Sequence, residues 1–130
     1  MSYQPRTGAV LFANGLDRVA NFYSVVLGLT EANRAEDHIE LESPGFQLVV
    51  HRIPGSRSAA DEITVPPTRR ANAAFKPVFF MRSISELRGL VEANGGVMEP
   101  ADHEWSFNGV TVCDALDPEG NVIQFRGYGG

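Results

Sequence analysis

The stretch LDRVANFYSVVLGL, residues 16–29, decides how the chain begins to fold. Its apolar residues recur every three or four positions, which is the spacing of one face of an amphipathic helix. They are Leu16, Val19, Ala20, Tyr23, Val26 and Leu27. Asn14 precedes the pattern as a candidate cap, and Gly28 follows it where a left-handed residue often ends a helix. We therefore expect a helix with one face on a hydrophobic core.

Strand-like segments surround this helix, and the same order of segments returns in the second half of the chain. AVLFA (9–13) precedes the helix, TEANRAED (30–37) follows it, and HIELES and FQLVVHRI flank a Ser-Pro-Gly turn as a hairpin. In the second half, KPVFFMRS is a strand, and Ser83 and Glu86 have capping-box spacing at the start of a second helix. Three further strand segments complete it: VMEPADHEWSF, which Pro100 breaks, GVTVCDALD and NVIQFRG.

Two units of strand, helix and three strands predict an α+β protein. We expect module 1 at about residues 8–53, a polar and Pro-rich linker at about 54–74, and module 2 at about 75–128. Because a unit of about 60 residues buries too little surface on its own, we expect the two modules to form a single domain. In that domain a curved mixed sheet would surround a shared cavity, with the helices outside.

Composition and charge exclude several classes of function. The net charge is −5, with 16 acidic and 11 basic residues, and Arg69-Arg70 is the only cluster of Lys or Arg, which argues against nucleic-acid binding. No apolar run approaches the roughly 20 residues of a membrane span, and MSYQPRTG lacks the apolar core of a secretory signal. A single cysteine, Cys113, suits a reducing compartment. We expect a cytoplasmic protein that binds neither nucleic acid nor membrane.

The helix and the end of the chain together resemble a known superfamily. The resemblance rests on Phe22-Tyr23 and Leu27-Gly28-Leu29 in the first helix, ANGG at the end of the second helix, and the turn Asp117-Pro118-Glu119-Gly120-Asn121 before the last strand. With these motifs the chain resembles the glyoxalase/bleomycin-resistance/extradiol-dioxygenase proteins, which have the vicinal oxygen chelate fold. The resemblance covers nearly the whole chain and implies a homodimer. It says less about chemistry, because this fold carries many functions.

The resemblance also identifies where a metal would bind. Metal-dependent members take a ligand, usually His or Glu, from each of up to four inner strands, and those positions correspond here to Gly8, Gln47, Lys76 and Gln124. Glycine has no donor, lysine is protonated at neutral pH, and glutamine offers only a neutral amide. The resemblance therefore implies that the fold is present without its metal site. We predict no cofactor, and a divalent metal enters only under the alternative function given below.

A small-molecule site remains the natural use of these strands. Because side chains alternate along a strand, Gln47 shares a face with His51, Lys76 with Phe80, and Gln124 with Arg126. Trp105 and Phe107 fall where the family often has a strand at the cavity mouth, although core or dimer packing explains both residues slightly better. The expected ligand-binding residues are Gln47, His51, Lys76, Phe80, Trp105, Gln124 and Arg126.

The three histidines are not arranged as a metal site in the sequence. His38, His51 and His103 are not at ligand spacing, and none pairs with a carboxylate in a known motif. His38 and His103 are expected at the surface or in the core, and His51 is a weak candidate for a general base.

Two functions follow from these observations. The first is a glyoxalase/bleomycin-resistance-like protein with a metal-free small-molecule-binding pocket, of the sequestration or resistance type. The alternative is a metal-dependent glyoxalase-like lyase or isomerase, or an extradiol-type dioxygenase, with a non-standard site. Whether the chain is an enzyme stays open at this point, and the sequence does not identify the ligand.

Overall fold

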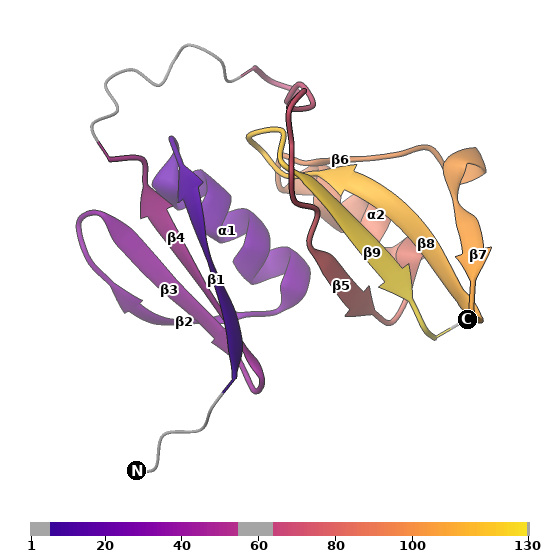
Figure 1. The fold of residues 1–130 in the computed structure, drawn as a ribbon, viewed down its shortest axis with the longest axis horizontal. Coiled ribbons are helices and arrows are strands. Elements are labelled where there is room, and N and C mark those ends of the chain that lie inside the picture. Colours follow the sequence, from indigo (N-terminus) through magenta and orange to yellow (C-terminus); the bar gives the residue numbers. More distant parts are fainter. Residues whose placement is uncertain (1–5, 55–63, 130) are drawn as a thin grey trace. The chain divides into compact units, whose positions relative to one another are not determined.

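The chain contains two compact units, residues 1–61 and 62–130, each built from one sheet and one helix (Figure 1). The computed structural model describes residues 6–54 and 64–129. The predicted linker at 54–74 lies partly outside the described residues, and its described part at 64–74 contains no helix or strand. The α+β class and the repeat of two similar units are confirmed.

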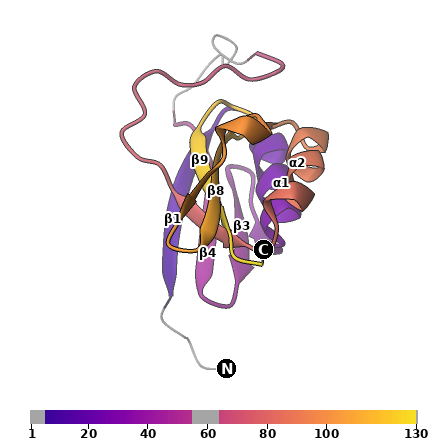
Figure 2. The same cartoon turned by 90° about the vertical axis from the view of Figure 1, so that its right-hand side faces the viewer.

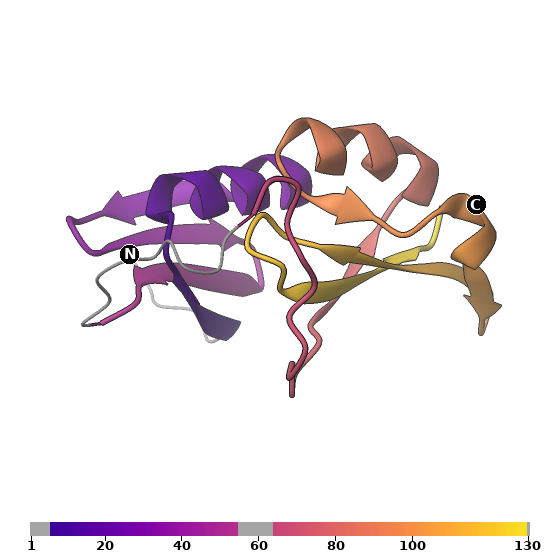
Figure 3. The same cartoon turned by 90° about the horizontal axis from the view of Figure 1, so that it is seen from above.

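The first unit is a four-stranded mixed sheet with α1 on one face (Figure 3). Its strand order is β1-β4-β3-β2, where β1 and β4 are parallel and the other pairs antiparallel. The helix buries Val19, Phe22 and Val26 on the side where Ile39, Leu41, Leu48 and Val50 of the sheet are also buried. The elements are β1 (Thr7–Ala13), α1 (Leu16–Leu27), β2 (Thr30–Arg34), β3 (His38–Ser43) and β4 (Phe46–Arg52).

The second unit repeats this arrangement with α2 on one face of its sheet (Figure 2). The strand order β5-β9-β8-β6 corresponds to that of the first unit, with β5 and β9 parallel, and β7 pairs with the other end of β8. Leu87 and Val91 of α2 pack over the buried Cys113, Ile123 and Phe125. The elements are β5 (Val78–Met81), α2 (Ile84–Ala93), β6 (Val97–Met98), a 3-10 turn (Ala101–His103), β7 (Trp105–Phe107), β8 (Val110–Leu116) and β9 (Val122–Gly127).

Two of the three helix caps expected from the sequence are confirmed. Gly28 ends α1 with φ of 71°, as expected, and Ser83 caps α2 by accepting a hydrogen bond from the backbone N–H of Glu86 at 3.2 Å. The N-cap of α1, however, is Gly15 and not Asn14. Neither α1 nor α2 is long and apolar enough to cross a lipid bilayer.

The turn between β8 and β9 is held by one buried carboxylate. Asp117 is fully buried, and its Oδ1 accepts hydrogen bonds from the backbone N–H groups of Glu119 and Asn121 at 2.9 and 3.0 Å. Its Oδ2 accepts a third from the Asn121 side chain at 2.8 Å. These bonds fix the register in which β9 returns along β8, and therefore which side chains of the two strands face each other.

Candidate functional site

The second sheet has one face against α2 and a second face that carries the chemistry. Residues paired across antiparallel or parallel neighbours point to the same face. The register pairs Gln124 with both Val78 and Asp114, and Arg126 with both Phe80 and Val112, while Trp105 pairs with Val112. We call this surface the second-sheet face; its chemically important residues are Lys76, Phe80, Trp105, Phe107, Asp114, Gln124 and Arg126.

A continuous chain of hydrogen bonds crosses the second-sheet face. The Asp114 carboxylate accepts from Lys76 Nζ on Oδ2 and from Gln124 Nε2 on Oδ1, both at 3.0 Å. Gln124 Oε1 in turn accepts from Arg126 Nε at 2.8 Å. Gln124 is only 5% exposed, so both ends of its amide are satisfied inside the protein. One carboxylate among two cations leaves this group with a formal charge of +1.

Aromatic rings flank the cationic end of that chain. The Arg126 guanidinium carbon lies 5.7 Å from the centroid of Phe80 and 5.6 Å from that of Phe107, within range for cation–π attraction to both rings. Phe80 and Phe107 are exposed, and so is Trp105. Large aromatic side chains that remain exposed beside an ordered arginine form a surface on which a planar, negatively charged molecule can stack.

Gln47 and His51 lie on the corresponding face of the first sheet, as their spacing predicted. Gln47 Nε2 donates to Glu42 Oε2 at 2.9 Å, and that carboxylate also accepts from Arg6 at 3.1 Å. Gly8 pairs with Gln47 in the parallel ladder, and a Cβ added at Gly8 would lie 2.9 Å from the Gln47 carbonyl oxygen. The backbone would have to move before position 8 could hold any ligating side chain.

The four positions that the family uses for a metal therefore do not fit one. Gly8 contributes no side chain, and Gln47 directs its amide nitrogen at Glu42. Lys76 and Gln124 both direct donors at Asp114, and a positive ammonium group or an amide N–H cannot coordinate a cation. Asp114 was not among the predicted site residues, although it joins two of them.

The histidines differ from the sequence-based interpretation, because each has a carboxylate partner. His38 Nδ1 lies 2.9 Å from Asp37 Oδ1, His51 Nε2 lies 3.6 Å from Asp37 Oδ2, and His103 Nδ1 lies 2.9 Å from Glu99. The bond to Asp37 raises the pKa of His38 above its ordinary value and lowers that of Asp37. The His51–Asp37 pair forms across the β3–β4 hairpin and is distant in sequence, whereas Asp37 adjoins His38 and Glu99 lies four residues before His103.

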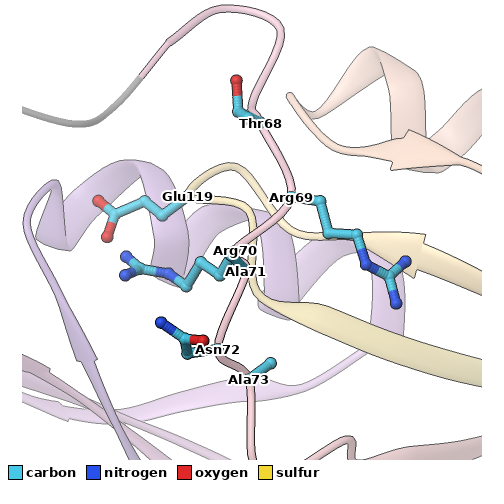
Figure 4. A pocket seen from close by; sticks show the side chains of 7 residues that line it. All are labelled: Thr68, Arg69, Arg70, Ala71, Asn72, Ala73 and Glu119. Carbon is cyan, nitrogen blue, oxygen red and sulfur yellow. The ribbon is translucent and has the colours of Figure 1, made fainter.

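A pocket of about 400 Å³ lies elsewhere in the second unit (Figure 4). The segment at 68–73 and Glu119 line it, and the backbone N–H of Arg70 donates to Gly120 O at 3.0 Å, which ties that segment to the β8–β9 turn. Arg69 and Arg70 extend to opposite sides of the segment (Figure 4). None of the predicted site residues lines this pocket.

The fold agrees with that of several solved structures. No family model matches the sequence, and no curated protein matches it either. The chain is similar to a glyoxalase/bleomycin resistance protein/dioxygenase family enzyme from Burkholderia phytofirmans, with a TM-score of 0.71 and 15% identity over 93% of this chain and 96% of that one. A glyoxalase/bleomycin resistance protein from Albidiferax ferrireducens gives a TM-score of 0.67 at 19% identity over 93% and 96% of the two chains.

The fosfomycin resistance protein FosX from Listeria monocytogenes is also similar, with a TM-score of 0.66 and 13% identity over 98% of this chain and 93% of that one. These likenesses confirm that the chain has the fold of the glyoxalase/bleomycin-resistance/dioxygenase superfamily. At such identities the fold is what is shared, and the chemistry has to be argued from the residues of this chain.

Proposed function

We propose that the chain is a small-molecule-binding protein of the sequestration or resistance type, and that its ligand binds on the second-sheet face without a metal ion. The observation that carries this proposal is the hydrogen bonding of Gln124. This residue occupies the position of the family's final-strand metal ligand, yet its amide is used to connect Asp114 to Arg126. The strand thus presents a fixed cation between two aromatic rings in place of a metal-binding carboxylate.

The chemistry of this face favours an aromatic anion. The Arg126 guanidinium and the rings of Phe80 and Phe107 are three neighbouring planar groups, and the Trp105 indole is a fourth on the same face. Stacking on such a group contributes about 0.5–1.5 kcal/mol per aromatic pair. The formal charge of +1 from Lys76, Asp114 and Arg126 disfavours a cationic ligand. Gln47 and His51 are proposed as ligand contacts on the first sheet.

The alternative of a lyase, isomerase or dioxygenase with a metal at the family's positions has no support from the donor atoms there, since Lys76 and Gln124 present N–H groups. We further propose, from the family resemblance, that the protein works as a homodimer in the cytoplasm.

Fluorescence titration tests the proposal directly, because Trp105 is the only tryptophan in the chain and lies on the proposed face. We expect 1-naphthoate to quench Trp105 emission at lower concentration than the uncharged 1-naphthylmethanol. Bleomycin, a cationic glycopeptide, serves as the arm of opposite charge. The comparison of the two naphthyl compounds isolates the contribution of the cationic group.

Two phenylalanines provide a matched pair of variants. Phe80→Ala removes a ring beside Arg126 and should weaken naphthoate binding by roughly 5- to 30-fold, equivalent to about 1–2 kcal/mol. Phe75→Ala removes a ring that is 77% exposed and should leave binding unchanged. Equal effects of the two substitutions, or binding of no panel member, would contradict the proposal.

A further inference from the structure

A group of metal-ligating side chains lies on the first unit, away from the positions that the family uses. Among the described residues, Asp37, His38 and His51 each offer one ligand atom, and these three atoms lie within 4.8 Å of one another. We call this group the Asp37 cluster. The family's two positions on the same sheet are Gly8 on β1 and Gln47 on β4, which pair with each other. Gln47 lies four residues before His51, and neither Gly8 nor Gln47 belongs to the cluster.

The β3–β4 hairpin builds the Asp37 cluster. The register pairs His38 with His51, so both imidazoles stand on the same face, with centroids 5.9 Å apart and planes inclined by 6°. The loop before β3 is held by two backbone hydrogen bonds of 2.8 Å, from Arg52 N to Asp37 O and from Ala35 N to His38 O. These bonds place the Asp37 carboxylate between the two rings' nitrogen atoms.

The hydrogen bond of His51 leaves one of its nitrogens available. His51 Nδ1 lies 2.7 Å from the Arg52 carbonyl oxygen, which can only accept, so the proton resides on Nδ1. The neutral ring then has its lone pair on Nε2, and that atom faces Asp37 Oδ2 at 3.6 Å. A backbone carbonyl that fixes the tautomer in this way is the usual outer partner of a metal-bound histidine.

His38 has an equivalent outer partner in a carboxylate. Its Nε2 lies 3.4 Å from Glu40 Oε2, while its Nδ1 faces Asp37 Oδ1 at 2.9 Å. Without a metal ion Nδ1 donates to Asp37, because a carboxylate can only accept. Metal binding replaces that proton with the ion, and Nε2–H then donates to Glu40. A carboxylate, a histidine and a metal in series form a common arrangement in metalloproteins.

We propose that Asp37, His38 and His51 bind a divalent first-row transition metal ion, through one carboxylate oxygen, His38 Nδ1 and His51 Nε2. Two imidazoles and a carboxylate suit Zn²⁺, Ni²⁺ or Co²⁺ better than Mg²⁺ or Ca²⁺, which prefer oxygen ligands alone. The side chains of His38, His51 and Asp37 are 26%, 31% and 60% exposed, so water can complete the coordination. Glu40 adds negative charge, and Arg52, which donates to Glu36 O, is the nearby cation.

The site lies in the other unit from the second-sheet face. It shares one residue, His51, with the ligand contacts proposed above, so the metal titrations are made without any organic ligand. His103 offers a matched control. It also lies near two carboxylates, Glu99 at 2.9 Å and Asp102 at 3.9 Å, but does not belong to the Asp37 cluster. A histidine beside carboxylates is therefore present both inside and outside the proposed site.

The test titrates chelator-treated full-length protein with Zn²⁺ by calorimetry and with Co²⁺ by visible absorption. We expect one ion per chain in the wild type. His38→Ala and His51→Ala should each weaken binding by at least about tenfold, Glu40→Gln by about tenfold through loss of an outer partner, and His103→Ala by less than about twofold. Circular dichroism of each variant checks that it is folded.

A second measurement uses the wild type alone. Zn²⁺ should protect His38 and His51 from modification by diethylpyrocarbonate while His103 reacts at an unchanged rate. The proposal is overturned if no ion binds at about 100 µM Zn²⁺, if His103→Ala matches His51→Ala, or if Zn²⁺ gives no selective protection. Loss of metal binding in Gln124→Ala with retention in His51→Ala would refute both this site and the metal-free second-sheet face. The naphthoate titration tests separately whether an aromatic anion binds to that face.

Discussion

Gln124→Glu supplies the carboxylate that the family's metal site uses, and we expect it to destabilise the protein at neutral pH. Gln124 is 5% exposed, and its amide nitrogen donates to Asp114 Oδ1 at 3.0 Å. In the variant an oxygen replaces that nitrogen, so two carboxyl groups face each other at hydrogen-bond distance. Two ionised carboxylates this close repel each other by several kcal/mol at the effective dielectric of a protein.

The free energy of protonating the introduced carboxyl limits the cost of this substitution. With an ordinary pKa, a Glu side chain costs about 3.7 kcal/mol to protonate at pH 7 and about 1 kcal/mol at pH 5. Once protonated, its O–H donates to Asp114 as the amide did. Arg126, which already bonds Gln124 Oε1, offsets part of the penalty. We expect a loss of about 2–4 kcal/mol at pH 7 and about 1 kcal/mol or less at pH 5.

The sign of the pH dependence follows from the direction of the pKa shift. The introduced carboxyl has a higher pKa in the folded than in the unfolded protein, because Asp114 disfavours its charged form. The variant therefore matches wild type most closely below the unfolded pKa of about 4.3, and loses stability as the pH rises from there to the folded pKa.

Urea unfolding followed by Trp105 fluorescence at pH 5 and pH 7 measures this difference. Gln124→Met is the control, since it removes both hydrogen bonds of the amide without adding a charge, and its loss should be the same at both pH values. The reasoning is refuted if Gln124→Glu loses equal stability at pH 5 and pH 7. It is also refuted if Ni²⁺ or Zn²⁺ raises the melting temperature of Gln124→Glu by more than that of the wild type.

Two further predictions concern the second unit. Gly120→Ala should lower the free energy of unfolding in urea by about 2–4 kcal/mol. The reason is that φ at Gly120 is 82° and the added Cβ would lie 2.0 Å from the carbonyl oxygen of Thr68. A loss below about 1 kcal/mol would show that the segment at 68–73 moves freely. Cys113 is buried, and burial raises the pKa of its thiol, so iodoacetamide should label this thiol only as fast as the protein unfolds. The contribution of the neutral thiol to the free energy of unfolding should be present below the ordinary thiol pKa and decline as the pH rises through the raised value. Rapid labelling of the native protein at pH 8 would contradict this prediction.

Much of the fold follows from local patterns, because each unit is built from a helix and strands with clear boundaries. The break expected at Pro100 is confirmed, because the segment VMEPADHEWSF forms two short strands, β6 and β7, with a 3-10 turn after Pro100 between them. Proline lacks the N–H that a continuous strand would need at that point. The helix cap at Gly15 differs from the expected Asn14 by one residue, which is within the usual spread of helix starts.

The site was only partly predictable because cross-strand register decides it. Alternation correctly grouped Lys76 with Phe80 and Gln124 with Arg126, but the pairing of Phe80 with Arg126 depends on a parallel ladder between distant segments. The sequence does contain a signal for the Asp114–Gln124 pair and for the His38–His51 pair. In each pair the two residues lie equally far from the turn that joins their strands, which is centred at Glu119 for the first pair and at Pro44-Gly45 for the second. Counting outward from those turns predicts both pairs.

The close approach of β1 to β4 at Gly8 limits which single substitutions this chain can tolerate. A side chain at position 8 would meet the Gln47 carbonyl oxygen at 2.9 Å, and a carboxylate at position 124 would meet Asp114. Each substitution toward the metal-binding pattern is therefore harmful by itself, and neither relieves the other because they lie in different units. A metal site at the positions that the family resemblance identifies therefore requires compensating changes elsewhere in the chain first.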